Sequence, residues 1–304
     1  MTDESVRISL CIVSWNVRDD LLACLNSLPD ASQDCPIETI VVDNASSDDT
    51  VDLLRERFPE VVLIANRENR GFAGGTNQAL AAARGDYLML LNPDTVLPPG
   101  ALSDLLTFAE AHPEAGIVAP KLVNPDGSLQ HSCRRFPRIA AALFRHTILG
   151  RLFPNNPWAS EYIMGDWAHD SVREVDWVSG ACFMVRRALY KEIGALDEGF
   201  FWGSEDVDYC YRAHAAGSAV LYTPSPAIMH RIGSSSSQMP VRTIINFHRS
   251  MHRLYRKHLA RNVFEYGLAS VGIVTRAVLL IVSWWARFAY GVLSRPFRKA
   301  KEQA

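Results

Sequence analysis

Short apolar stretches alternate with amphipathic ones over the first hundred residues, and this alternation limits the chain to few folds. The apolar stretches are typical of buried β-strands and the others have helical periodicity. The predicted strands are residues 8–13, 38–43, 61–65 and 87–92, and the predicted helices are residues 19–28, 48–58 and 73–83. Such βαβ units build a parallel sheet covered on both faces. We therefore expect a doubly wound α/β domain with ligands at the carboxyl ends of its strands.

The second part of the chain is less regular at first and then returns to strands and helices. Residues 128–170 are rich in Arg, Pro, Phe and Trp and predict an insertion over the site. The elements expected around this insertion are helices 98–114, 187–193 and 206–216, and strands 116–123, 174–178, 182–186 and 219–222. We find no internal repeat in the sequence.

Charge divides the chain into two parts. Residues 1–241 carry 19 basic and 31 acidic side chains, whereas residues 242–304 carry 12 basic and 2 acidic ones. The two parts therefore face different partners. We predict a catalytic domain at residues 1–240 and a basic, amphipathic, helical extension at residues 241–304.

The extension contains a mostly apolar stretch, residues 264–293. Arg276 and Arg287 interrupt it and leave ten uncharged residues between them, about half of the ~20 that span a bilayer. The polar residues fall on one helical stripe, with Leu, Val, Trp and Phe over the remainder. This pattern predicts a helix lying in the membrane interface. The alternatives are packing on the catalytic domain or on a partner in a homodimer, and the Trp-bearing helix suits lipid better than nucleic acid.

Cysteine usage and the N-terminus bear on the compartment. The six cysteines form no C-x-x-C pair and most lie in apolar runs, where a thiol behaves as a small apolar group. The first seven residues lack the basic region of a signal peptide. We expect a reduced, cytoplasmic protein, peripheral on the inner face of the cell membrane.

Two polar turns follow predicted strands in the first half of the chain. Asp43 ends a buried strand, so we expect it to contact a ligand, whereas Ser47, Asp48 and Asp49 are expected to cap the next helix. Residues 69–77 form a glycine-rich turn into a helix, where backbone N–H groups and a basic side chain could approach a phosphate or ribose. A glycine cluster by itself is weak evidence for such a site.

Three further places carry candidate chemistry. Asp94 follows a strand in an Asn-Pro-Asp sequence and offers a hard oxygen ligand for Mg²⁺ or Mn²⁺, although the same sequence also makes ordinary turns. Glu205 and Asp206 could cap a helix, or supply a carboxylate that deprotonates a hydroxyl. A lone His230 is more often structural than a ligand.

Taken in order, seven segments resemble the inverting GT-A glycosyltransferases of family 2, which include bacterial rhamnosyltransferases. The resemblance covers roughly residues 6–240, and the segments are residues 12–16, 42–48, 69–77, 91–94, 177–181, 204–208 and 230–234. Each segment is weak alone, and their order makes the resemblance specific. It implies a nucleotide site formed by Ser14, Asp43, Asn44, Arg70 and Gly71, in which Asp43 binds the base.

The resemblance also implies the rest of the site and the reaction. Asp94 and His230 would hold the metal that bridges the donor diphosphate. Asp206 would be the catalytic base, and the residues shaping the acceptor and sugar site would be Trp177, Ser179, Gly180 and Glu205. A single displacement would then move a sugar, with inversion, from a nucleotide diphosphate to a hydroxyl of a glycan or polyprenyl-linked acceptor.

One position departs from the family pattern. The metal motif is usually Asp-x-Asp, but Asn92 stands in its first position, which leaves one carboxylate ligand and puts strict metal dependence in doubt. Asn-Pro-Asp is frequent in the rhamnosyltransferase-like branch, so the resemblance favours dTDP-rhamnose as donor.

Two other functions are alternatives to glycosyl transfer. A nucleotidyltransferase usually has a glycine-rich basic loop after strand one, and the residues after Val13 form no such loop. A non-catalytic scaffold that binds nucleotide sugar or lipid would not need Asp206.

Overall fold

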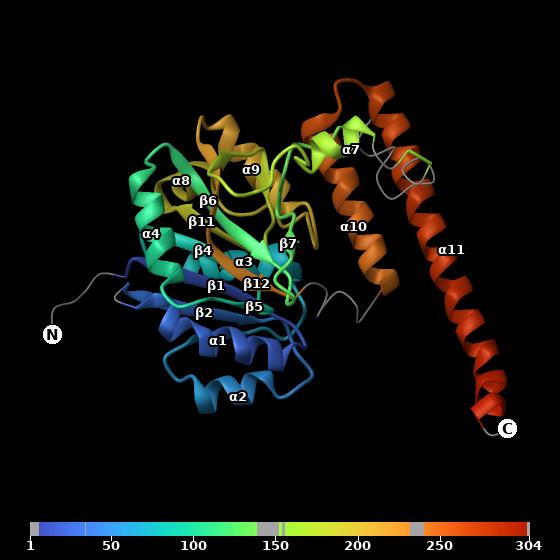
Figure 1. The fold of residues 1–304 in the computed structure, drawn as a ribbon, viewed down its shortest axis with the longest axis horizontal. Helices are drawn as coiled ribbons and strands as arrows, with labels where there is room; N and C mark the ends of the chain where they lie inside the picture. Colours follow the sequence, from blue (N-terminus) through green and yellow to red (C-terminus); the bar gives the residue numbers. More distant parts are fainter. Residues whose placement is uncertain (1–5, 34, 139–151, 154–155, 232–239, 303–304) are drawn as a thin grey trace.

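The catalytic domain has three layers, a central sheet with helices on both faces, and two long helices lie beside it (Figure 1). A computed structural model describes residues 6–33, 35–138, 152–153, 156–231 and 240–302 of the chain. The helices of the domain are α1 (Arg18–Ser32), α2 (Thr50–Arg57), α3 (Gly71–Ala82), α4 (Ala101–Ala111), α7 (Pro157–Tyr162), α8 (Arg187–Ile193) and α9 (Glu205–Ala215).

Among the described residues, ten strands join in one sheet whose main path runs β3-β2-β1-β4-β11-β6-β12-β5. These strands are β1 (Ile8–Ser14), β2 (Ile37–Asp43), β3 (Val62–Ala65), β4 (Tyr87–Leu91), β5 (Thr95–Val96), β6 (Ala115–Val123), β7 (Leu129–Gln130), β9 (Arg173–Glu174), β11 (Cys182–Arg186) and β12 (Ala219–His230). Two short strands, β8 (Cys133–Arg134) and β10 (Trp177–Val178), pair separately. The first four strands are parallel, as the βαβ pattern predicts.

The sheet is mixed, which differs from the expected parallel sheet. Strand β11 runs antiparallel to both β4 and β6. The chain leaves β6 at the carboxyl edge, passes through the long segment that ends with β10, and enters β11 from that same edge. A strand that begins there must run in the opposite direction, so residues 179–181 come to lie beside the end of β4.

Alternate residues of the central strands supply two apolar cores. Leu10 and Ile12 of β1 belong to the cluster that contains the apolar sides of α1 and α4. Cys11 and Val13 belong to the cluster on the opposite face, with residues of α3, α8 and α9. Side chains of a strand point alternately to its two faces, so β1, which is buried along its whole length, contributes to both cores.

Strand β12 extends well past residue 222, where the sequence pattern predicts its end. The prolines of the following segment indicate a break, but the strand resumes its pairing with β6 after a register shift between Thr223 and Ala227. The extension brings His230 opposite Thr95 of β5. The longer strand therefore places His230 next to the end of β4.

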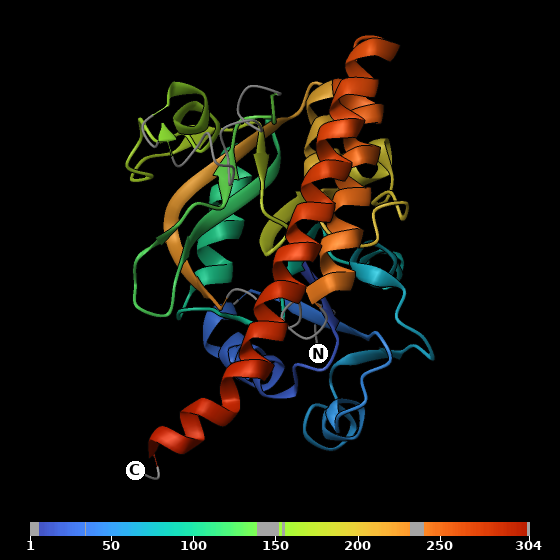
Figure 2. The same ribbon diagram turned by 90° about the vertical axis from the view of Figure 1, so that its right-hand side faces the viewer.

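The C-terminal extension is a helical hairpin of α10 (Pro240–Leu254), the π-helical turn η2 (Tyr255–Leu259) and α11 (Val263–Glu302). Both views show α11 running beside α10 (Figures 1 and 2). Arg276 of α11 donates to His248 Nε2 of α10 at 2.9 Å, and His252 Nε2 lies 3.0 Å from Ser270 Oγ. Arg276, which interrupts the apolar stretch, therefore faces α10, whereas Arg287 is exposed.

The apolar side of α11 is exposed. Val271 is 66% exposed and Val278 is 53% exposed. The stretch Val263–Phe288 has 26 residues and contains an 18-residue window with a mean hydropathy of 1.8, which makes it long and apolar enough to cross a membrane by these two measures. This finding differs from the expectation that Arg276 and Arg287 make the apolar run too short.

Ion pairs join the hairpin to the catalytic domain. Asp197 accepts from Arg253 at 2.8 Å and from Lys257 at 2.9 Å. Asp208 of α9, which is fully buried, pairs with Lys257 at 2.7 Å and with His258 at 2.6 Å. These contacts fix η2 and the end of α10 against α9, so the hairpin is attached to the helix that bears Asp206.

Candidate active site

The first part of the site is the pair of strand ends formed by β1 and β2. Ser14 and Asp43 are opposite each other in the parallel register, and Asp43 is 1% exposed. Its Oδ1 accepts from the Ser46 N–H at 2.9 Å. Asp43 Oδ2 and Ser14 Oγ have no hydrogen-bond partner among the described residues. A buried polar atom without a partner is costly, so these two atoms mark a place for ligand groups.

The loop that begins α3 closes against these strands. The Asn44 side chain donates to the Gly71 carbonyl at 2.9 Å. Gly71 has φ +76°, and a Cβ there would lie 2.5 Å from the Phe201 carbonyl oxygen. Glycine is required here for both reasons. Asn44 and Gly71 thus shape the loop, while their nucleotide contacts remain predictions.

The N–H groups at the start of α3 are already bonded within the protein. Gly71 donates to Asn69 Oδ1 at 2.9 Å, and Phe72 donates to the Phe201 carbonyl at 3.0 Å. These two groups are therefore engaged in holding the loop rather than directed at a phosphate. The exposed Arg70 remains the basic group of this loop that was predicted to contact the nucleotide.

Asp94 and His230 come together at the end of β4. Asp94 Oδ1 lies 3.2 Å from His230 Nε2, and it accepts no hydrogen bond from the part of the chain that the structure describes. The Gln130 amide nitrogen donates to Asn124 Oδ1 at 3.0 Å, so its oxygen faces His230 Nδ1 at 2.7 Å. His230 Nδ1 therefore carries a hydrogen, and the Nε2 atom faces a carboxylate oxygen. Either a proton or a metal cation must lie between these two atoms.

The donor set fits a divalent metal with few protein ligands. Adjacent ligands of an octahedral cation at about 2.1 Å are about 3.0 Å apart, close to the separation of Asp94 Oδ1 and His230 Nε2. No group of three or more His, Cys, Asp or Glu side chains gathers among the described residues. Two protein ligands suffice when a bound diphosphate and water complete the shell. Asn92 Nδ2, 3.4 Å from His230 Nε2, adds no anionic ligand.

Backbone hydrogen bonds connect the turn that carries Asp94 to the predicted base, Asp206. The Asn92 N–H donates to the Ala181 carbonyl at 2.8 Å. One residue earlier, the Gly180 N–H donates to Asp206 Oδ2 at 2.9 Å, while the Val207 N–H donates to Asp206 Oδ1 at 2.8 Å. The antiparallel course of β11 thus brings Asp94 and Asp206 to one edge of the sheet.

Two carboxylates lie side by side at the start of α9. Burial raises the pKa of Asp206. Burial and the charge of Asp206 raise the pKa of Glu205 well above its usual range, and Glu205 Oε2 has no hydrogen-bond partner among the residues described by the structure. A carboxylate with a raised pKa is a stronger base, and a protonated neighbour can donate a hydrogen bond. The pair can therefore receive a proton and orient a hydroxyl.

The predicted acceptor residues surround Asp206 from the β10 side. Trp177 is 5% exposed, and its Nε1 donates to the Arg135 carbonyl at 2.9 Å. The Ser179 N–H donates to the Ser132 carbonyl at 2.7 Å. These contacts fix the loop that carries Gly180, because Trp177 and Ser179, which precede it, are both bonded to the segment that contains β8.

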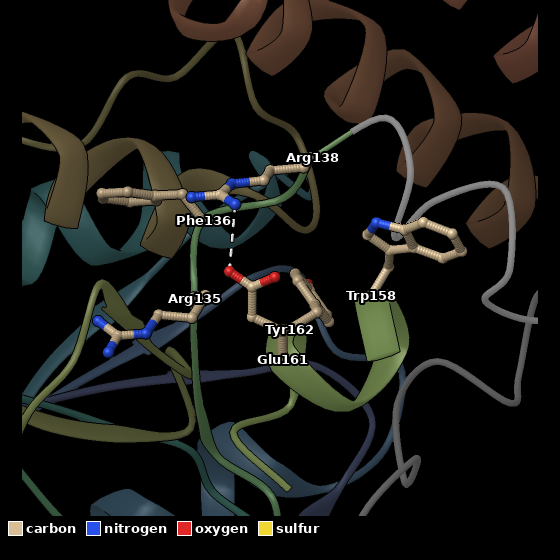
Figure 3. Close-up of a pocket in the computed structure, with 6 residues that line it drawn as sticks. All are labelled: Arg135, Phe136, Arg138, Trp158, Glu161 and Tyr162. Carbon is tan, nitrogen blue, oxygen red and sulfur yellow. Dashed lines mark hydrogen bonds and ion pairs between the residues drawn. The ribbon is translucent and has the colours of Figure 1, made fainter. Parts of the chain in front are cut away.

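Sequence reasoning missed Arg134. Its guanidinium carbon lies 5.0 Å from the centre of the Trp177 ring, and the two residues are paired between β8 and β10. The only available signal was the arginine-rich composition of residues 128–170, which does not single out one residue. Beside it lies a shallow pocket lined by Arg135, Phe136, Arg138, Trp158, Glu161 and Tyr162, in which Arg138 pairs with Glu161 at 3.1 Å (Figure 3).

Comparison with known proteins agrees with this architecture. A mannosyltransferase from Pyrobaculum calidifontis, solved with GDP-Man and Mn²⁺, superposes with a TM-score of 0.56 at 19% identity, covering 98% of this chain and 83% of that one. The N-acetylglucosaminyl-diphospho-decaprenol L-rhamnosyltransferase of Mycobacterium tuberculosis is 31% identical over 228 residues, or 71% of this chain and 74% of that protein. Rhamnosyltransferase WbbL of Escherichia coli is 28% identical over 168 residues, or 53% of this chain and 60% of that protein.

The mixed α/β sheet has the GT-A fold of nucleotide-sugar glycosyltransferases. The profile of glycosyl transferase family 2 matches residues 9–194. The chain belongs to glycosyl transferase family 2 and is an enzyme of the rhamnosyltransferase-like kind. The fold and family expected from the seven sequence segments are thereby confirmed.

Proposed function

We propose that this enzyme transfers L-rhamnose from dTDP-rhamnose to a hydroxyl of a polyprenyl diphosphate-linked sugar in cell-envelope glycan synthesis. The observation that carries the proposal is the placement of Asp206, a carboxylate with a raised pKa, held by Gly180 beside the Asp94 and His230 pair. The choice of sugar and acceptor is supported by the mycobacterial relative, whose name specifies rhamnose and a diphospho-decaprenol acceptor.

Asp206 is the base in the proposed reaction. It accepts the proton of the acceptor hydroxyl, whose oxygen attacks the anomeric carbon from the face opposite the nucleotide. The bond to the diphosphate breaks with its electron pair, and the anomeric configuration inverts. The N–H groups of Gly180 and Val207 hold the carboxylate in one orientation, and such positioning is a large part of catalysis. Protonated Glu205 orients a sugar hydroxyl.

The donor occupies the crevice above β1, β2 and β4 in this proposal. Asp43 Oδ2 accepts from the nucleobase, and Ser14 and Arg70 contribute to the nucleotide site. Asp94 and His230 would hold Mg²⁺ or Mn²⁺, which would supply positive charge against the departing diphosphate. A solved neighbour of the same fold contains Mn²⁺. His230 is kept in the ligating tautomer by Gln130.

The C-terminal hairpin would bring the enzyme to the cytoplasmic face of the membrane. Arg276 of α11 is used in a contact with α10, and the apolar side of α11 is exposed. Because ion pairs attach α10 and η2 to the catalytic domain, a helix that remains packed along α10 lies in the interface rather than across the bilayer. Basic residues beyond Phe288 suit anionic headgroups.

Co-sedimentation with anionic phosphatidylglycerol vesicles tests the membrane proposal. The double variant Val271→Glu, Val278→Glu places two charges on the exposed side of α11 and should remain largely in the supernatant, whereas the wild type sediments. Val62→Glu is the control, because Val62 is 44% exposed on the catalytic domain. Equal sedimentation of all three proteins would contradict membrane binding through α11. A dimer that dissociates in the double variant without any lipid effect would favour the homodimer.

The catalytic proposal is tested by measuring nucleoside diphosphate release and glycolipid product. Purified enzyme is incubated with UDP-, GDP- and dTDP-sugars, Mg²⁺ or Mn²⁺, and a short-chain polyprenyl diphosphate N-acetylglucosamine. We expect acceptor-dependent dTDP release from dTDP-rhamnose alone, with inverted product. Turnover with another donor would reject rhamnose but keep the transferase. Absence of turnover together with absence of nucleotide binding would favour the non-catalytic scaffold.

A further inference from the structure

Arg134 is a cation near the proposed base, and it has no role in the proposed catalytic steps. Its Nη2 donates to the His131 carbonyl at 3.0 Å. Its Nε is buried and has no hydrogen-bond partner, and no carboxylate lies within ion-pair distance of it among the described residues. Three neighbouring arginines differ from it, because Arg135, Arg138 and Arg173 are paired with Asp176, Glu161 and Asp166. Arg134 therefore keeps hydrogen-bonding capacity for an external anion.

Aromatic rings hold the Arg134 side chain in place. Its guanidinium lies 5.0 Å from the Trp177 ring centre and 6.0 Å from the Tyr162 ring centre. Stacking on aromatic faces orients the planar group and leaves its N–H edge available. A fixed guanidinium with free donors can form bidentate hydrogen bonds to a phosphate group.

The position of Arg134 relative to Asp206 suits an acceptor rather than the donor. Arg134 is paired with Trp177, and three residues later Gly180 donates to Asp206. Burial raises the pKa of Asp206, and the charge of Arg134 is near enough to oppose this rise. The donor diphosphate is expected at Asp94, on the β4 side. An anion at Arg134 would lie on the β8 and β10 side of the base.

A series of stacked rings connects the segment after Arg134 to the C-terminal hairpin. Phe136 stacks on Tyr211 of α9 with ring centres 3.6 Å apart, and Tyr211 stacks on His258 of η2 at 4.5 Å. A ligand with one end at Asp206 and the other near the hairpin would pass Arg134. A lipid-linked sugar has this form, with a hydroxyl at one end, a diphosphate after one sugar ring, and then the apolar chain.

We propose that Arg134 binds the diphosphate of the polyprenyl-linked acceptor, held for this purpose against Trp177 and Tyr162. The inference rests on the proposed function, because it assumes that the acceptor hydroxyl is delivered to Asp206. Arg134 selects acceptors that carry a diphosphate directly on the reacting sugar. It sets acceptor affinity without taking part in proton transfer.

The test is a binding experiment that needs no turnover. Farnesyl diphosphate and uncharged farnesol are titrated into full-length enzyme by calorimetry, in buffer with and without excess dTDP and MgCl₂. We expect the wild type to bind farnesyl diphosphate more tightly than farnesol, with dTDP leaving this affinity unchanged. Arg134→Met should weaken farnesyl diphosphate binding about 10- to 100-fold, the usual effect of losing hydrogen bonds to a charged group.

Two further variants make the result specific. Arg173→Met is the matched control, because Arg173 also stacks on a Trp ring, at 5.2 Å from Trp167, but is paired with Asp166. It should bind as the wild type does. Arg134→Lys keeps the charge without the planar fork and should fall between wild type and Arg134→Met. Thermal melting of each variant identifies any that fails to fold.

Three outcomes would overturn the proposal. The first is equal binding of farnesyl diphosphate and farnesol by the wild type. The second is displacement of farnesyl diphosphate by dTDP, which would locate it at the donor site. The third is wild-type affinity for farnesyl diphosphate in Arg134→Met. None of these depends on which sugar is transferred. A wrong donor or an inactive enzyme would therefore refute the proposed function and leave this measurement readable.

Discussion

Two groups of carboxylates on this enzyme differ in their hydrogen-bond partners. At the carboxyl edge of the sheet, one buried oxygen each of Asp43, Asp94 and Glu205 has no hydrogen-bond partner among the described residues. At the junction with the hairpin, Asp197 and Asp208 are saturated by basic side chains. Paired carboxylates hold two parts of a protein together, whereas unpaired ones cost stability and are retained where a ligand uses them.

The pKa shifts follow the same division. At the carboxyl edge of the sheet, burial raises the pKa of Asp206 and Glu205. At the junction, burial alone would raise the pKa of Asp197, but the hydrogen bonds from Arg253 and Lys257 lower it far below its usual range. Removing a carboxylate should therefore harm catalysis in the first region and stability in the second.

The largest effect is expected from Asp206→Asn. The amide cannot accept the acceptor proton, so kcat should fall about 10²- to 10⁴-fold, while nucleotide binding and the melting temperature stay close to those of the wild type. Steady-state release of nucleoside diphosphate gives kcat, and isothermal titration gives nucleotide affinity. Turnover within a factor of two of the wild type would remove Asp206 from the role of base.

Asp94→Ala should come next. Loss of the carboxylate removes the anionic ligand of the proposed metal site, so kcat/KM should fall about 100-fold or more. Excess Mn²⁺ should restore part of the lost activity. Asp126→Ala is the control, because Asp126 lies in an exposed turn at 124–127. An Asp94 variant with unchanged activity, or wild-type activity that survives a chelator, would show that transfer needs no metal at this site.

Asp197→Asn should lower stability without a direct effect on the chemical step. We expect a loss of about 1 kcal/mol at pH 7, since the partners are partly exposed. The folded-state pKa is depressed, so the contribution is present above the unfolded pKa of about 3.9 and is lost as the pH falls through the lower folded value. Urea unfolding of both proteins from pH 7 to pH 3 measures this. A difference that grows toward pH 3 would contradict the assignment.

Glu205→Gln should give the smallest change in stability and one of the opposite sign. The folded-state pKa of Glu205 is raised, so its contribution is favourable below the unfolded pKa and is lost as the pH rises through the folded value. Replacement by the neutral amide should therefore stabilise the enzyme by about 0.5–1 kcal/mol at pH 8 and leave it unchanged near pH 4. The same urea series checks this, and destabilisation at pH 8 would mean that the carboxylate is paired.

Much of the fold follows from local patterns. The boundaries of Cys182–Arg186 and Arg187–Ile193 agree with those expected, and the first four strands are parallel as predicted. Strands and helices of this kind bury apolar side chains at regular intervals, so periodicity reports them directly. The positions of Asp43 and Asp94 at strand ends follow from the same periodicity.

Other features could not be predicted in this way. Strand β12 runs to His230 because its second half pairs with β5 and β6, although two prolines indicate a break. The glycine-rich turn looks suited to phosphate, yet Gly71 is needed for its contact with Phe201. Both depend on segments more than a hundred residues away, which no local pattern reports.

The sequence by itself determined which residue types stand at the strand ends, and the order of motifs that marks the family. The tertiary structure alone decided that β11 runs antiparallel, which joins Gly180 to Asp206, that Arg134 lies on Trp177, and that Arg276 of α11 faces α10. The physical reason is that periodicity records whether a side chain is buried. What it is buried against is decided by the packing of distant segments.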